Sequence, residues 1–436
     1  MADLPALLAG RLERLPQIRR WVIAFSGGVD SRVLLELCAR LLPAERLLAL
    51  HVDHQVQASS GQWAAQCGAI CAGLGVPFQT LAVNPSSPSE ADLRDARYAA
   101  FLSVLREGDC LLLAQHADDQ AETLLLRLLR GAGVRGLAAM PRQRALGPAL
   151  LLRPLLDQPR ERLEQWARSQ QLEWVEDPSN ADEGYDRNWL RLNLLPQLRA
   201  RWPRLHQRVT TTTAQLAEAY ALLDEVAAAD LAQFQRGAEC LVLEGLGSLS
   251  EARTRNLLRY WVHRISGHWL SYDELRHLQL QVIAAGEDRT PELQLGNYWL
   301  RRYRQRLYLL PAPPDPQPPF DLVVEPRHWA LAQGRLSFES GDAPGIAVGT
   351  HLSLVYRQGG ERLRPLGRGG SVGLKQLLQE AGVPPWWRAD WPLLCRDGEI
   401  VAVPGICLCE GAVSESGLTP QWQPLGLSDG GGFGRL

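Results

Sequence analysis

The chain has 436 residues, with 46 lysines and arginines against 48 aspartates and glutamates and a formal net charge of −2. This balance argues against a uniformly basic nucleic-acid binder, and the length indicates two or three domains of roughly 150 residues each. No segment approaches the ~20 apolar residues of a membrane span and no secretory signal pattern is present, so we expect a cytoplasmic protein without a membrane partner.

Short apolar runs alternate with helical patterns over the first two hundred residues, which is typical of a parallel sheet covered on both faces. Predicted strands are 21–25, 46–52, 76–83 and 110–115, predicted helices are 60–74, 92–106 and 119–130, and apolar segments at 150–155 and 172–175 flank a further helix. The carboxyl ends of such strands meet at one edge, where ligands bind. Asp53 follows the second strand at that edge.

Residues 26–31 read Ser-Gly-Gly-Val-Asp-Ser between the first strand and a helical pattern. The two glycines let backbone N–H groups approach an anion closely, and the two serines add hydroxyl donors. Asp30 would repel a bare phosphate, so we expect it to hold a Mg²⁺ ion that bridges to phosphates. The predicted nucleotide-binding residues are Ser26, Gly27, Gly28, Val29, Asp30, Ser31 and Asp53.

This loop differs from two common nucleotide-binding motifs. A Walker A loop requires Gly-Lys-Ser or Gly-Lys-Thr, and a dinucleotide turn requires Gly-x-Gly-x-x-Gly. The loop resembles instead the signature Ser-Gly-Gly-x-Asp-Ser of the PP-loop ATPases, which split ATP between the α and β phosphates and adenylate a substrate. An ordinary glycine turn with an aspartate near the helix start is the alternative.

A second polar cluster follows the strand at 110–115. Asp119 and Glu122 are three residues apart, so their carboxylates share one face of a helix. Such a pair can bind Mg²⁺ or an ammonium group, whereas the alternative is that the helix dipole favours acids in the first turn. The glycine-rich segment 130–137 that follows carries two arginines, which suits phosphate or RNA, and Gly131 alone would serve as a helix stop.

Arginines and aromatic residues are concentrated in two segments. Six arginines lie in 187–208 with two tryptophans and no acidic residue, and four lie in 298–306 with two tyrosines and a tryptophan. Arginine pairs with phosphate and stacks on bases, so these segments favour RNA binding over a solvated face, which remains the alternative for either segment alone.

Five motifs together resemble the bacterial tRNA(Ile)-lysidine synthetases. In chain order they are Ser-Gly-Gly-Val-Asp-Ser at 26–31, His-Ala-Asp-Asp-Gln-Ala-Glu-Thr at 116–123, Arg-Gly-Ala-Gly at 130–133, Asp-Pro-Ser-Asn at 177–180 and Arg-Asn-x-x-Arg at 187–191. The resemblance is close over about 20–205. It extends more loosely through 364–375 and 384–388, which look like the C-terminal domain of the longer family members.

The resemblance implies ligation of free L-lysine to C2 of the wobble cytidine (position 34) of tRNA(Ile) with a CAU anticodon. ATP would first adenylate the base and release pyrophosphate, and the ε-amine of lysine would then expel AMP. By the same resemblance the lysine-binding residues are His116, Asp119 and Glu122, and the tRNA or phosphate contacts are Arg97, Arg130, Arg187 and Arg191. The cofactors are ATP and Mg²⁺, with Asp30 as the metal ligand. Whether Asp118 or Asp119 shares the metal stays open.

The implied domain order is a PP-loop ATPase domain at 1–208, a mainly helical tRNA-binding domain at 209–310, a linker at 311–320 and a small mixed α/β or β-rich tRNA-binding domain at 321–436. The linker has six prolines in ten residues, which suits a semi-rigid spacer. The oligomeric state is left open.

Three other functions would require only part of these motifs or additional residues. A tRNA thiolase would share the adenylation chemistry but needs catalytic cysteines. The eight cysteines are sparse, Cys110 lies in an apolar run, and Cys67 and Cys71 have helical spacing, so we predict core thiols with no structural zinc and no iron–sulfur cluster. An RNA-binding module without catalysis would not need Asp119 and Glu122, and a small-molecule ligase would leave the arginine segments without a role.

Overall fold

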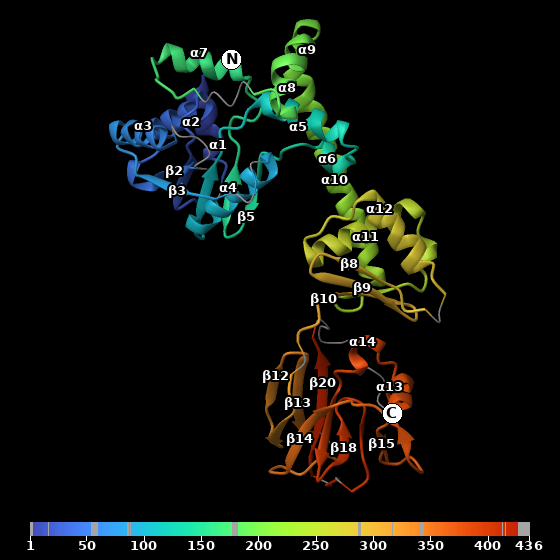
Figure 1. Cartoon of the computed structure of the whole chain (residues 1–436). Helices are drawn as coiled ribbons and strands as arrows, with labels where there is room; N and C mark the ends of the chain where they lie inside the picture. Colours follow the sequence, from blue (N-terminus) through green and yellow to red (C-terminus); the bar gives the residue numbers. More distant parts are fainter. Residues whose placement is uncertain are drawn as a thin grey trace. The chain divides into compact units, whose positions relative to one another are not determined.

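The computed structural model describes residues 3–15, 17–53, 60–84, 87, 89–176, 182–286, 289–315, 317–340, 344–411, 413–414 and 416–425. The chain divides into two compact units, Met1–Leu222 and Leu223–Leu436, which we call the first and second unit (Figure 1). The Asp-Pro-Ser-Asn motif at 177–180 lies outside the described residues.

A six-stranded sheet with strand order β3-β2-β1-β4-β6-β5 forms the centre of the first unit. Its strands are β1 (Arg20–Ala24), β2 (Leu47–Asp53), β3 (Phe78–Ala82), β4 (Asp109–Leu112), β5 (Gln143–Leu146) and β6 (Ala149–Leu152). Neighbouring strands are parallel except at the edge, where β5 pairs antiparallel with β6. The predicted parallel sheet is therefore confirmed, with one antiparallel edge strand added.

Helices pack on both faces of this sheet. On one face lie α1 (Leu4–Leu12), α2 (Val29–Leu41), α3 (Ser60–Gly73) and α7 (Arg160–Ser169), and on the other lies α4 (Glu90–Val104). The first unit also contains α5 (Ala117–Leu129), α6 (Val134–Leu137), α8 (Asp186–Trp189) and α9 (Leu195–Arg201), with a π-helical turn at Leu190–Leu194, and α5 packs against α9. Side chains alternate along β1, so Trp21 and Ile23 pack into a core with α1, α2 and α7, while Val22 packs with Phe101 of α4. This alternation is what places α2 and α4 on opposite faces.

The segment 172–175 forms no strand, unlike the apolar segment at 150–155, which contains the end of β6. The backbone N–H of Val175 donates to the carbonyl of Gly27 at 2.9 Å, so this segment closes against the glycine loop. Leu172 and Trp174 pack against the first-unit core, which accounts for their apolar character.

The second unit begins within the long helix α10 (Leu205–Phe234) and combines helices with a four-stranded antiparallel sheet of order β7-β10-β9-β8. Its further elements are α11 (Glu251–Ser266), α12 (Tyr272–His277), a π-helical turn at Leu278–Ile283, β7 (Cys240–Val242), β8 (Glu292–Leu295), β9 (Tyr298–Tyr303) and β10 (Arg306–Pro311). Trp261 of α11 is fully buried in the core that joins the helices to the sheet. The helical region expected from the sequence is present, together with this sheet.

The C-terminal part of the second unit is rich in β-structure, as predicted. A five-stranded sheet has the order β11-β14-β17-β18-β19, a three-stranded sheet the order β12-β13-β20, and β15 pairs with β16. The elements are β11 (Phe320–Val323), β12 (His328–Leu331), β13 (Gly334–Ser340), β14 (His351–Tyr356), β15 (Arg362–Leu363), β16 (Val372–Gly373), α13 (Leu374–Glu380), α14 (Pro385–Arg388), β17 (Pro392–Arg396), β18 (Glu399–Val403), β19 (Cys407–Leu408) and β20 (Leu418–Pro424). Trp391 is fully buried in their shared core.

The cysteines have the environment expected of core thiols. Seven of the eight are buried, and Cys67 and Cys71 of α3 pack into the first-unit core. Among the described residues, no helix has the length and apolar character needed to cross a membrane.

Candidate active site

The Ser-Gly-Gly-Val-Asp-Ser loop joins the carboxyl end of β1 to α2, and its shape requires glycine at one position. Gly27 has φ of +89°, and a Cβ atom there would lie only 2.8 Å from the Cys67 sulfur. The Ser31 hydroxyl donates to the carbonyl of Gly28 at 2.9 Å and lies 3.0 Å from the Ser26 hydroxyl. The loop is therefore held by its own hydroxyl groups, by α3 and by the Val175 hydrogen bond.

The first turn of α2 follows this loop, and no described side chain caps it. Its N–H groups and the positive end of its dipole are thus available to an anion in front of the loop. Val29 begins the helix with a buried side chain, whereas Asp30 is partly exposed. This geometry is compatible with the predicted binding of phosphate groups by the loop, which stays a prediction.

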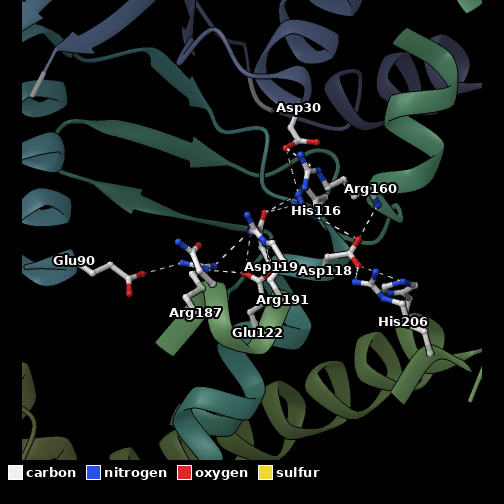
Figure 2. Close-up of polar contacts among 12 residues, drawn as sticks. Asp30, Glu90, His116, Asp118, Asp119, Glu122, Arg160, Arg187, Arg191 and His206 are labelled. Carbon is white, nitrogen blue, oxygen red and sulfur yellow. Dashed lines mark hydrogen bonds and ion pairs between the residues drawn. The ribbon is translucent and has the colours of Figure 1, made fainter. Parts of the chain in front are cut away.

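His116 lies beside Asp30, immediately before α5. Its Nε2 atom is 3.4 Å from a carboxylate oxygen of Asp30 and 3.4 Å from one of Asp119 (Figure 2). The imidazole is buried, which by itself lowers its pKa, but the charge of Asp119 and the contact with Asp30 outweigh burial and raise the pKa above 6.5. The protonated imidazolium is therefore favoured between two carboxylates.

The two adjacent aspartates of α5 have different environments. Asp118 is buried, accepts the backbone N–H of Arg160 at 2.8 Å, and forms an ion pair with Arg199. The Asp119 carboxylate instead accepts the backbone N–H of His116 at 3.0 Å on the side of Asp30. Asp118 therefore ties α5 to the start of α7 and to α9, and Asp119 faces the glycine loop.

Glu122 is fully buried between two arginines. One of its oxygens accepts from Arg187 Nε at 2.7 Å, and the other accepts from Arg191 Nε at 2.7 Å (Figure 2). Asp119 is 3.3 Å from Arg191 Nη2 and 3.6 Å from Arg187 Nη2. Burial lowers the pKa of each arginine and raises that of Asp119, yet the opposite charges dominate: both arginine pKa values are raised and that of Asp119 is lowered.

The remaining predicted residues lie around this group. Asp53 ends β2 at the edge of the sheet where the loop lies, with a partly buried side chain. Arg97 is exposed on α4, and Arg130 follows α5 with an exposed side chain 3.4 Å from Asp186. The structure thus brings Asp30, His116, Asp119, Glu122, Arg187 and Arg191 into one connected network.

Arg160 was not identified from the sequence. It begins α7, and its Nε atom lies 3.7 Å from Asp30 and 3.3 Å from Glu164. Pro159 marks a helix start, but no local pattern connects that helix with the distant glycine loop. Arg160 places one more positive charge at the mouth of the phosphate cradle.

The donor atoms present suit a magnesium ion that also binds phosphates. One carboxylate oxygen of Asp30 is buried and pairs with no described donor, and Asp119 approaches the same nitrogen of His116. Mg²⁺ prefers one or two carboxylates together with phosphate oxygens and water. Within the described ranges, no group of three or more histidine, cysteine or acidic side chains would hold a metal by itself. The residues therefore fit Mg²⁺ in a nucleotide complex.

The arginine and aromatic segment at 298–306 is divided between surface and interior. Arg301 lies over Trp299 at 5.1 Å and over Trp386 at 5.6 Å. Arg302 is buried and donates to backbone carbonyls, among them that of Ile283 at 2.8 Å. The interpretation of Arg302 as an RNA contact is therefore wrong, because its guanidinium satisfies carbonyls at the end of a helical segment.

Comparison with known proteins gives three family matches along the chain. Residues 7–198 match the PP-loop domain, residues 241–308 match the TilS substrate binding domain, and residues 352–422 match the TilS substrate C-terminal domain.

Several curated relatives are similar over nearly the whole chain. The tRNA(Ile)-lysidine synthase of Pseudomonas syringae pv. tomato is 43% identical, with 95% of this chain and 94% of the relative covered. The enzyme of the same name from Pseudomonas fluorescens is 42% identical, with 97% of each chain covered. That from Alkalilimnicola ehrlichii is 44% identical, with 92% of each chain covered.

Proposed function

This chain belongs to the tRNA(Ile)-lysidine synthase family, and on that premise we propose that it ligates free L-lysine to C2 of the wobble cytidine of tRNA(Ile) at the expense of ATP. The observation that carries the proposal is the grouping of Asp30, His116 and Asp119 beside an open phosphate cradle. The reaction would give lysidine, AMP and pyrophosphate through an adenylated tRNA base.

In the first step, the C2 oxygen of the cytidine attacks the α-phosphate of ATP and pyrophosphate leaves. The loop at 26–31 and the first turn of α2 hold the departing phosphates through backbone N–H groups and hydroxyls. Asp30 would hold Mg²⁺, and Asp118 would not share it, because Asp118 is already tied to Arg160 and Arg199. When bound, Mg²⁺ offsets the negative charge of the phosphates.

His116 acts as a hydrogen-bond donor in this proposal rather than as a base. Its raised pKa favours the protonated form, which suits contact with an α-phosphate oxygen in the transition state. Arg160 supports the same charge, since its guanidinium lies within 3.7 Å of Asp30.

In the second step, the ε-amine of lysine attacks C2 and AMP leaves. We propose that Asp119 and Glu122 orient lysine, with different contributions. Both oxygens of Glu122 are engaged by Arg187 and Arg191, so Glu122 acts by fixing these two arginines, and Asp119 is the carboxylate available to an ammonium group.

The tRNA is proposed to contact arginines at the rim of the site and both matched TilS domains. Arg97 and Arg130 have exposed side chains suited to backbone phosphates. The predicted tRNA-binding regions at 209–310 and 321–436 contain the matches to the substrate binding domain and the substrate C-terminal domain.

The proposal is tested by incubating the protein with ATP, radiolabelled lysine and tRNA(Ile) bearing a CAU anticodon. We expect label in the tRNA with AMP and pyrophosphate formed. The same tRNA with uridine at the wobble position is the matched control and should stay unlabelled. Cleavage of ATP to AMP without label in the tRNA(Ile) would refute lysine as the second substrate.

A further inference from the structure

A pocket of the first unit, separate from the residues of the candidate active site, is rich in arginine. It is lined by Arg11, Arg14, Leu15, Arg142, Gln143 and Leu152. The lining comes from three places in the chain: α1 and the residues after it, the start of β5, and the end of β6.

The positive charge of this pocket exceeds its negative charge. Arg11 and Arg142 share one carboxylate oxygen of Asp157, at 2.6 and 2.9 Å, and Arg14 is exposed without an ion-pair partner among the described residues. Hydrogen bonds from Gln158, Arg11 and Arg142 outweigh burial and lower the pKa of Asp157 to about 2, so it stays ionised. Asp157 thus pairs with two of the three arginines, and Arg14 adds a positive charge that it does not pair with.

The guanidinium groups are close enough to repel one another. Burial is the main cause of the lowered pKa of Arg11, and the charges of Arg142 and Arg14 lower it further. A bound anion would reduce this repulsion, and Leu15 and Leu152 contribute apolar side chains to the wall of the pocket.

We propose that this pocket binds a phosphate group. Three arginines line one cavity, and arginine recognises phosphate oxygens by paired, charge-assisted hydrogen bonds. The phosphate comes either from the backbone of the tRNA or from a free polyphosphate. Measurements of tRNA affinity and of stabilisation by pyrophosphate distinguish these two sources.

The test uses the full chain with Arg14→Ala and Arg142→Ala combined, and Arg168→Ala as the matched control. Arg168 is an exposed arginine on α7 outside the pocket. If the pocket holds a tRNA phosphate, the double variant should bind tRNA about tenfold more weakly, and the slope of log affinity against log salt should fall by about 1 to 2. The control should bind as the wild type does.

Inorganic pyrophosphate distinguishes the second source. Unchanged tRNA binding, with a smaller rise of the thermal midpoint on adding pyrophosphate than in the wild type, would assign the pocket to a free polyphosphate. No change in either measurement would overturn the proposal. If the double variant does not fold, Arg14→Ala alone gives the same comparison, because its side chain is exposed. All readouts are of binding, so they do not depend on lysidine formation.

Discussion

Replacing Glu122 with glutamine tests the centre of the site, because it keeps the size of the side chain but removes its charge. Breaking a buried ion pair from one side costs about 3–5 kcal/mol. Arg187 and Arg191 are 22% and 23% exposed and both keep Asp119 as a neighbour, so part of their charge remains compensated. We therefore expect Glu122→Gln to lower the free energy of unfolding by about 2–3 kcal/mol.

Urea unfolding followed by circular dichroism measures this loss, and equal slopes for variant and wild type make the midpoints comparable. Glu161→Gln is the matched control, since Glu161 is exposed on α7, and it should change stability by about 0.5 kcal/mol or less. A loss below about 1 kcal/mol for Glu122→Gln would refute the ion-pair argument.

The same variant separates the two chemical steps. Pyrophosphate release from ATP and tRNA without lysine reports adenylation, and lysidine formation reports adenylation followed by lysine transfer. We expect adenylation to survive better than lysine transfer, because Glu122 fixes Arg187 and Arg191 on the side of Asp119 proposed for lysine. Equal losses in both steps would contradict a lysine-orienting role.

Three other changes give independent checks. Gly27→Ala places a Cβ atom 2.8 Å from the Cys67 sulfur at φ of +89°, so it should lower the free energy of unfolding by about 1–2 kcal/mol and weaken ATP binding. Gly10→Ala is the control, because a Cβ atom there has no neighbour within 4 Å, and it should weaken neither the stability nor ATP binding. Calorimetry measures both quantities for both variants. Asp30→Ala should abolish pyrophosphate release in a mixture of ATP, tRNA(Ile) and lysine, and release at the wild-type rate would remove Asp30 from the mechanism. Because the folded-state pKa of His116 is raised above 6.5, its protonation stabilises the fold below that pH and the contribution is lost as pH rises through the raised value. The stability difference between wild type and His116→Gln should therefore shrink as the pH rises above 6.5, and a constant difference would contradict the assigned environment.

The parallel strands were predictable because burial on both faces leaves short, nearly continuous apolar runs such as 47–52. The segment 172–175 has the same apolar character, but its backbone forms a hydrogen bond with the glycine loop instead of a strand pairing. The pattern of apolar residues cannot distinguish these two cases. The edge strand β5 was missed because three of its four side chains are exposed.

The sequence could group candidate site residues only where they lie close together in the chain. Asp30 follows two glycines, and Asp119 and Glu122 share one turn of α5. Their partners were not predictable, because Arg187 and Arg191 approach Glu122 from 65 and 69 residues away. Sequence spacing cannot show ion pairs over such a separation, so the sequence predicts only that Arg187 and Arg191 contact phosphate or tRNA.

The close packing of Gly27 against Cys67 makes the thiol a reporter of loop opening. Cys67 is completely inaccessible, and burial raises the pKa of its thiol to about 11, so alkylating reagents cannot reach a thiolate while the loop is closed. Labelling of Cys67 therefore requires the loop and α3 to separate. The alkylation rate of Cys67 therefore measures how often the loop separates from α3. A nucleotide that holds the loop against α3 should slow the alkylation.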